Sequence, residues 1–122
     1  MGKGAAAVVR ADGEAVCERL VVADNPLTRL KGLLGRARLE PTEGLLIKPT
    51  SAIHTCFMRF PIDALFLDRD LNVVGIESDL RPWRFAGRRG AKVVIELAAG
   101  EGRRRGIQLG DRLELFDAGV SG

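Results

Sequence analysis

Seven short segments of the chain are rich in apolar residues and are bounded by glycine, proline, aspartate or asparagine. In residues 16–22 apolar and polar side chains alternate with a period of two, which is typical of a strand with one buried face. Segments 62–67 and 73–77, joined by a polar turn, form the clearest predicted hairpin. The remaining predicted strands are residues 44–48, 53–58, 93–97 and 112–116.

One short helix is predicted between the first two of these strands. Asn25 can cap a helix that begins at Pro26 and ends near Gly35, with Leu27, Leu30 and Leu34 on one face. Seven strands and one helix, without a regular alternation of strand and long helix, favour an antiparallel β-sandwich or barrel.

The length of 122 residues and the content of 46% hydrophobic and 29% charged residues indicate one water-soluble domain. We place this domain at residues 16–117, between an N-terminal extension at 1–15 and a C-terminal tail at 118–122. No apolar run approaches the roughly 18 residues that cross a membrane, and the N-terminal apolar stretch is shorter than an export signal requires. These features predict a cytoplasmic protein.

The net charge of +3 hides an uneven distribution along the chain. Residues 81–106 hold eight basic and two acidic residues, and residues 27–38 hold four basic residues and no acid. Two connections, 78–92 and 98–111, exceed ordinary hairpin length, and long loops are often functional. If these loops and the helix share one end of the domain, that Arg-rich end would attract an anionic or polar small molecule or a protein partner.

The segment Arg81-Pro82-Trp83-Arg84-Phe85 alternates cations with aromatic rings. This mixture can stack on single-stranded nucleic acid, although a tryptophan in a loop more often anchors the loop itself. No recognised nucleic-acid motif accompanies it, so we rank nucleic acid below the other partners.

His54, Cys56 and Met58 occupy alternate positions of the predicted strand 53–58 and form a ligand set suited to copper(I). On a straight strand the first and the last lie about 13 Å apart, too far to share one ion. His54 and Cys56 could also pair as base and nucleophile. The favoured interpretation is that Cys56 and Met58 pack in the core and that no metal is bound.

Asp63 shares a strand face with Leu65 and Leu67, where a charge requires partners. We expect it to accept hydrogen bonds from backbone amides or from Arg36 or Arg59. A role in a structural network is favoured over catalysis. Glu96 could supply a second carboxylate for catalysis if the fold brings the two together.

The sequence Ile53-His54-Thr55-Cys56-Phe57-Met58-Arg59-Phe60-Pro61-Ile62-Asp63-Ala64-Leu65-Phe66-Leu67-Asp68 resembles the bacterial and archaeal family known as domain of unknown function 192. The resemblance extends over residues 16–117, with further matches at Arg29-x-x-Gly32-Leu33-Leu34-Gly35-Arg36 and Glu96-Leu97-Ala98-Ala99-Gly100. It implies a compact, mainly antiparallel β-sandwich of jelly-roll-like topology with a short helix.

The same resemblance implies candidate site positions without roles, because the family has no established activity. These positions are Arg29, Arg36, Met58, Asp63 and Glu96. Many members have an aromatic-Trp-Met core where this chain has Cys56-Phe57-Met58, and some members carry export signals.

Three functions remain open at this point. The leading one is a non-enzymatic binding module without a cofactor, with Trp83 and Arg84 added to the candidate ligand-binding residues. The second is an enzyme that uses Asp63 and Glu96, or Cys56, in a pocket rimmed by Arg36. The third is binding of copper or single-stranded nucleic acid.

Overall fold

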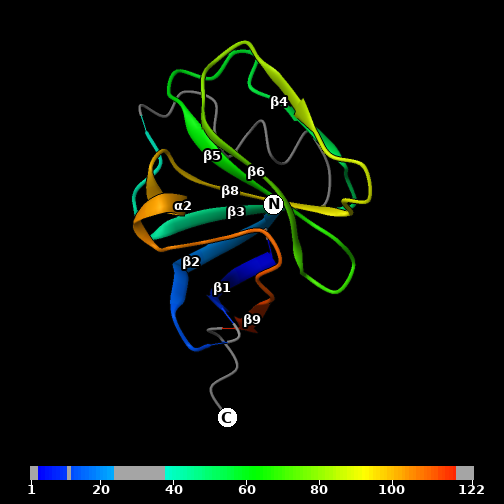
Figure 1. Cartoon of the computed structure of the whole chain (residues 1–122). Coiled ribbons are helices and arrows are strands. Elements are labelled where there is room, and N and C mark those ends of the chain that lie inside the picture. The colour runs from blue at the N-terminus through cyan, green and yellow to red at the C-terminus, as the bar shows by residue number, and fades with distance from the viewer. Residues whose placement is uncertain (1–2, 11, 24–37, 118–122) are drawn as a thin grey trace.

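The structure, a computed structural model, describes residues 3–10, 12–23 and 38–117. Over these residues the chain is mainly β, as predicted, with one helix of four residues. Figure 1 shows the order of the elements. Their bounds are β1 (Lys3–Arg10), β2 (Ala15–Ala23), β3 (Glu43–Ile47), β4 (Ala52–His54), β5 (Ile62–Leu67), β6 (Val73–Leu80), β7 (Phe85–Gly87), β8 (Val93–Ala98), α2 (Glu101–Arg104) and β9 (Leu113–Asp117).

Seven strands form one sheet in the order β6-β5-β8-β3-β2-β1-β9, and β4 pairs with β7 in a small second sheet. The pairing is mainly antiparallel, as predicted, and β2 and β3 form the one parallel pair among the described strands. A parallel pair needs a crossover of about a dozen residues or more, and the connection from Ala23 to Glu43 is long enough to provide it.

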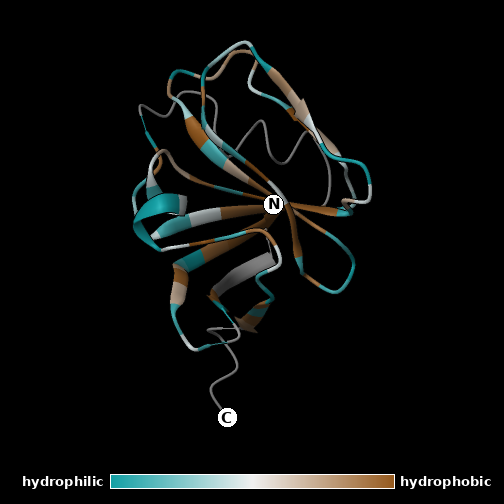
Figure 2. Cartoon of the chain, viewed as in Figure 1, coloured by the Kyte–Doolittle hydropathy of each residue, from teal (hydrophilic) through white to brown (hydrophobic). Residues whose placement is uncertain are grey.

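The large sheet curls without closing into a barrel. Its edge strands β6 and β9 meet at one corner, where Asn72 and Arg112 form a single bridge and the Val73 N–H donates to the Asp111 carbonyl at 2.8 Å. Side chains from both edges join one buried cluster on the concave face, including Val73 and Leu113. Apolar residues line the strands while the connections are largely polar, as Figure 2 shows.

The small sheet helps to cover the opposite face of the large sheet. Ile53, Met58 and Phe60 pack there against Ile62 and Phe66 of β5. The sheet therefore has an apolar layer on each face, which explains why all six residues of β5 are buried.

Six of the predicted strands correspond to β2, β3, β5, β6, β8 and β9. The predicted strand 53–58 is wrong beyond His54, where the chain turns through Cys56 and Phe57. Two strands were not predicted: β1, which lies within the expected N-terminal extension and pairs with both β2 and β9, and β7, within the long loop 78–92. The predicted helix near Pro26 lies outside the described residues.

Candidate functional site

Asp63 lies on β5 with 1% of its surface exposed and accepts three backbone hydrogen bonds. Its Oδ2 accepts from the N–H groups of Gly100 at 3.0 Å and Gly102 at 2.8 Å, and its Oδ1 accepts from the Asp79 N–H at 2.9 Å. Of the partners expected from the sequence, the backbone amides are therefore found. Among the described residues no arginine hydrogen-bonds to this carboxylate, and Arg36 lies outside them.

These three bonds tie the end of β6 and the turn from β8 into α2 to the start of β5. Asp79 and Gly100 have positive φ angles of 53° and 92°, and a Cβ added to Gly102 would lie 3.1 Å from the Asp63 Oδ2. Positive φ and close approach both favour residues with little or no side chain, which accounts for the glycines. These contacts give Asp63 a structural role, in which its carboxylate fixes the position of neighbouring backbone segments.

Glu96 on β8 is completely buried, but it lies on the other face of the sheet from Asp63. In the β5–β8 pairing Asp63 is opposite Leu97 and Ala64 is opposite Glu96, so the two carboxylates occupy adjacent register positions. Neighbouring positions point to opposite faces. The fold therefore does not bring these two candidates together as an acid–base pair.

His54, Cys56 and Met58 do not share a strand face. The Cys56 N–H donates to the His54 Nδ1 at 3.2 Å across a turn, while Met58 is buried in the apolar layer below. The Nδ1 atom of His54 is therefore already occupied by a backbone hydrogen bond. Among residues 3–10, 12–23 and 38–117 no group of three His, Cys, Asp or Glu side chains is placed to hold a metal ion.

The other cysteine, Cys17 on β2, is completely buried within the concave cluster. Burial raises the pKa of its thiol to about 11, because the thiolate would lose its solvation. Cys17 is therefore a protonated core residue at neutral pH and not a nucleophile.

Thr55 is completely buried and joins two turns that lie far apart in the sequence. Its hydroxyl donates to the Arg81 carbonyl at 2.5 Å and accepts from the Arg84 N–H at 2.9 Å. Its carbonyl accepts from the N–H groups of Met58 at 3.2 Å and Trp83 at 3.1 Å. One side chain and its own backbone therefore fix both turns.

Each of these turns presents an aromatic ring to solvent. Phe57 and Trp83 have positive φ angles of 69° and 65°, and their ring centroids lie 4.7 Å apart at an interplanar angle of 58°. Phe57 is 62% exposed, Trp83 is 56% exposed, and Phe85 on the neighbouring strand is 79% exposed. We call Phe57, Trp83 and Phe85 together the aromatic surface.

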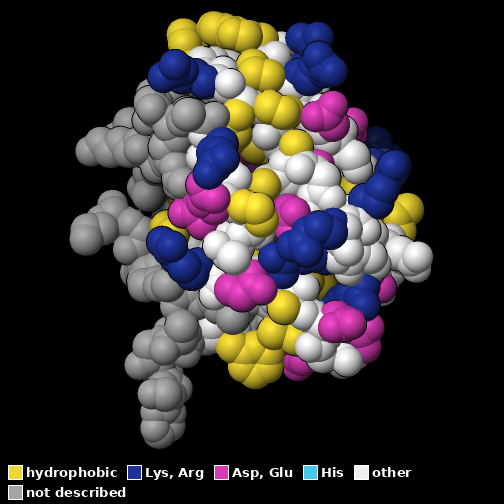
Figure 3. All heavy atoms as spheres, turned by 90° about the vertical axis from the view of Figure 1, so that its left-hand side faces the viewer, with side chains coloured by type: hydrophobic (Ala, Val, Ile, Leu, Met, Phe, Trp, Pro, Cys, Tyr) yellow, Lys and Arg dark blue, Asp and Glu magenta, His cyan; other side chains and the backbone are white. Residues whose placement is uncertain are grey.

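Cations accompany the aromatic surface. The side chains of Arg81 and Arg84 are exposed, and Arg81 lies 3.8 Å from the Asp79 carboxylate. Figure 3 shows hydrophobic side chains at the top of the molecule with Lys or Arg side chains on either side, at the level where Figure 1 labels β4. Trp83 and Arg84, both candidate ligand-binding residues in the sequence analysis, are exposed.

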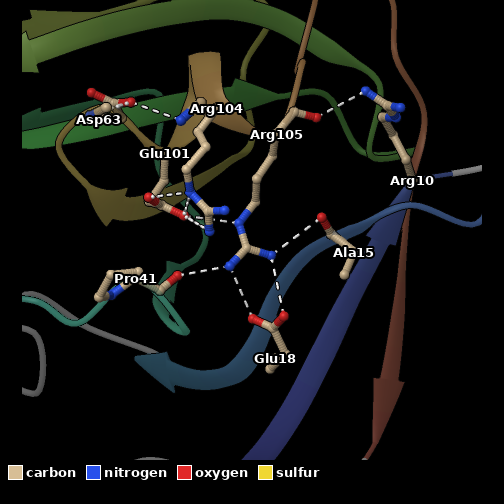
Figure 4. A network of polar contacts seen from close by, with 10 residues as sticks. Arg10, Ala15, Glu18, Pro41, Asp63, Glu101, Arg104 and Arg105 are labelled. Carbon is tan, nitrogen blue, oxygen red and sulfur yellow. Dashed lines mark hydrogen bonds and ion pairs between the residues drawn. The ribbon is translucent and has the colours of Figure 1, made fainter.

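The Arg-rich segment 98–111 is used differently. Arg105 is only 8% exposed and binds Glu101 at 3.0 Å, Glu18 at 3.0 Å and the Pro41 carbonyl at 3.0 Å, while Arg104 binds Glu101 at 2.6 Å (Figure 4). The Arg104 guanidinium holds the pKa of the Glu101 carboxyl below its usual range. Because Arg104 and Arg105 form these ion pairs, they contribute less to a positive surface than their place in the sequence suggests.

Sequence reasoning missed Phe57 and the role of Thr55, and it noted the ring of Phe85 without choosing Phe85 as a site residue. A strand over 53–58 would have placed Phe57 on an ordinary face, and the left-handed turn that exposes it leaves no composition signal. The rings at 83 and 85, separated by one arginine and bounded by Pro82 and Gly87, were the available indication.

Two of the site residues expected from the sequence, Arg29 and Arg36, lie outside the described residues. Among the described helices, none is long and apolar enough to span a membrane.

The fold and these contacts define a small, mainly β domain built on a curled mixed sheet and a small two-stranded sheet, with exposed aromatic rings on β7 and on the turns beside it. Residues 7–115 match the model of domain of unknown function 192, described as uncharacterized ACR. The chain belongs to this family.

Two curated relatives are archaeal members of the uncharacterised UPF0127 proteins. The UPF0127 protein PF1050 of Pyrococcus furiosus is 34% identical over 99 residues, covering 75% of this chain and 82% of the relative. The UPF0127 protein PYRAB11210 of Pyrococcus abyssi is 34% identical over 103 residues, covering 79% of this chain and 85% of the relative.

Two crystal structures share the fold. A "putative transcription regulator" from Sinorhizobium meliloti 1021 is 26% identical with a TM-score of 0.78, covering 91% of this chain and 92% of the other. A protein of unknown function from Novosphingobium aromaticivorans is 24% identical with a TM-score of 0.75, covering 90% of this chain and 83% of the other.

Proposed function

We propose that this chain is a non-enzymatic binding module that holds a protein partner through the aromatic surface. One observation carries the proposal. Phe57 and Trp83 are fixed in mutual contact by the buried Thr55, yet more than half of each side chain is exposed to solvent.

The backbone at these rings supports a binding role. Bulky residues avoid the left-handed region, and such conformations persist where surrounding structure enforces them, often at ligand sites. Here the hydrogen bonds of Thr55 enforce two such conformations side by side. Adjacent exposed aromatic rings are also typical of the anchor residues in protein interfaces.

The shape and charge of this face indicate the kind of partner. Small molecules favour concave sites, and none of the three rings lines the three pockets that the described residues form beside Leu46, Thr50 and Glu14. Exposed rings outside those pockets suit a protein partner. Because Arg81 and Arg84 stand beside the rings, the complementary surface should carry carboxylates together with apolar side chains.

The experiment begins with photo-crosslinking from the aromatic surface in the native host. Phe85 is replaced by p-benzoylphenylalanine, and a second protein carries the same replacement at Leu109, which is 67% exposed on the connection before β9. We expect a protein partner to be captured from position 85 and not from position 109. The contacted acidic segment is then synthesised as a peptide.

Binding of this peptide to the whole chain is measured by calorimetry and by the fluorescence of Trp83, the only tryptophan. Trp83→Ala and Arg84→Glu should each weaken binding about tenfold or more, and added salt should weaken it further. Arg103→Glu, an exposed charge change on α2, is the matched control and should have little effect.

Three results would overturn the proposal: equal capture from both positions, a peptide whose affinity ignores Trp83→Ala, or capture of nucleic acid in place of protein. The last outcome is tested explicitly because the structural relative from Sinorhizobium meliloti is described as a "putative transcription regulator" and because tryptophan and arginine can stack on single-stranded bases. Binding of only anionic metabolites or oligosaccharides would also contradict it.

A further inference from the structure

The two ends of the curled sheet are built differently. At the end where β5 begins and β8 finishes, α2 and its flanking turns cover the sheet: Gly102 of α2 is buried there, and Ile107 joins the concave cluster. At the other end, where β3 and β5 finish and β8 begins, a pocket of about 560 Å³ opens. Mouths of curled and barrel-like sheets are frequent ligand sites, and this volume suits one small ligand.

The floor and walls of this pocket are apolar. Leu46 of β3 and Val93 of β8 line it and belong to the concave cluster, so the pocket continues the hydrophobic core outward. Pro49 after β3, Leu71 of the β5–β6 turn and Leu115 of β9 complete its apolar lining. Leu115 is 40% exposed although it is a strand residue, which is consistent with a wall that lacks packing partners.

Three cations stand at the same pocket and no acid lines it. Lys48, Arg69 and Lys92 contribute to its lining with exposed side chains. No ion pair joins any of the three to a carboxylate within the described residues, in contrast to Arg104 and Arg105 at the other end. An apolar cavity with a cationic rim is complementary to a molecule with an apolar chain and an anionic head.

We propose that this pocket binds a free single-chain amphipathic carboxylate, with the acyl chain between Leu46, Leu71, Val93 and Leu115 and the carboxylate near Lys48, Arg69 and Lys92. The site shares no residue with the aromatic surface, so this inference does not depend on the proposed protein partner.

The probes are hexanoate, octanoate and decanoate, each added to the whole chain below its micelle concentration and followed by calorimetry and methyl NMR. Each added methylene should tighten Kd by up to about fourfold, the factor expected for full burial of one CH₂. Decanol, which has the same chain and no charge, should bind more weakly. Decanoate should shift the methyl resonances of Leu46 and Val93.

Variants test the two halves of the pocket. Lys48→Gln combined with Lys92→Gln should weaken decanoate binding at least about threefold, and Leu115→Trp should block the cavity. Thermal melting confirms that these proteins fold, and Arg103→Gln is the control with a cation removed elsewhere. Anionic phospholipid vesicles form a separate arm that tests a membrane source for the same chemistry.

The proposal is wrong if decanol binds as tightly as decanoate, if affinity ignores chain length, or if no fatty carboxylate shifts the Leu46 and Val93 resonances. Binding to vesicles without binding to free decanoate also contradicts it. Because Trp83→Ala leaves this pocket intact, loss of peptide binding with retained decanoate binding would separate this site from the aromatic surface.

Discussion

At the scale of single residues, burial alone does not reveal what a carboxylate does. Asp63 and Glu96 are both buried and lie on neighbouring strands, yet they occupy opposite faces of the sheet. Asp63 holds the end of β6 and the turn into α2 in place, because a carboxylate can accept several amide hydrogen bonds at once. Its value to the protein is structural, through segments that are distant in the sequence.

Asp63→Asn should therefore lower stability by about 2–3 kcal/mol, because the new amide group would face backbone donors. For a domain of this size we expect the melting temperature to fall by roughly 10 °C. Asp79→Asn is the matched control, since the Asp79 side chain is 57% exposed and Asn tolerates its positive φ. An unchanged melting curve for Asp63→Asn would refute this role.

At the scale of elements, the two turns beside the small sheet do more than the sheet itself to hold the aromatic surface in place. β4 and β7 contain three residues each, too few to hold a surface by themselves. The turns at Phe57 and Trp83 are connected because Thr55 is shared by both. A left-handed conformation at two bulky residues then becomes tolerable, as hydrogen bonds and ring contact offset its cost.

Thr55→Val keeps the side-chain volume and removes the hydroxyl, which leaves the Arg84 N–H and the Arg81 carbonyl without their partner. We expect a loss of about 1–3 kcal/mol in the free energy of unfolding. Acrylamide should then quench the fluorescence of Trp83 more strongly, because the indole ring becomes more accessible. Thr42→Val, at an exposed position, should change neither quantity; the same quenching in both variants would contradict the proposed role of Thr55.

At the scale of the whole molecule, Arg105 and Arg10 hold distant segments together. Arg105 connects α2 to Glu18 on β2 and to the Pro41 carbonyl before β3 (Figure 4). Arg10 on β1 in turn donates to the carbonyls of Arg105 at 3.2 Å and Gly106 at 2.7 Å. This network fixes the covered end of the curled sheet, while Lys48, Arg69 and Lys92 at the opposite end form no ion pair with the carboxylates that the structure describes.

Arg105→Gln should lower the unfolding free energy by roughly 2–4 kcal/mol, because the buried Glu101 loses one of its two arginine partners. Arg103→Gln, on the same helix and exposed, should be nearly neutral. Chemical denaturation at pH 7 measures both. The Glu101 pKa is lowered in the folded state, so its contribution is present above the carboxyl pKa of the unfolded chain and is lost as pH falls through the folded pKa.

The local pattern of the sequence determined the mainly β class, most strands and the need for partners at Asp63, because strand periodicity and the cost of a buried charge are local properties. It did not indicate β1, whose alanine-rich segment has weak strand propensity and forms a strand by pairing with β2 and β9.

Only the tertiary structure decided which functional residues meet. It separated Asp63 from Glu96, because strand register sets the face of each side chain. It also divided the arginines between internal ion pairs and open surface, and brought Phe57 to Trp83 through Thr55. Such contacts join residues far apart along the chain, and no local sequence pattern specifies them.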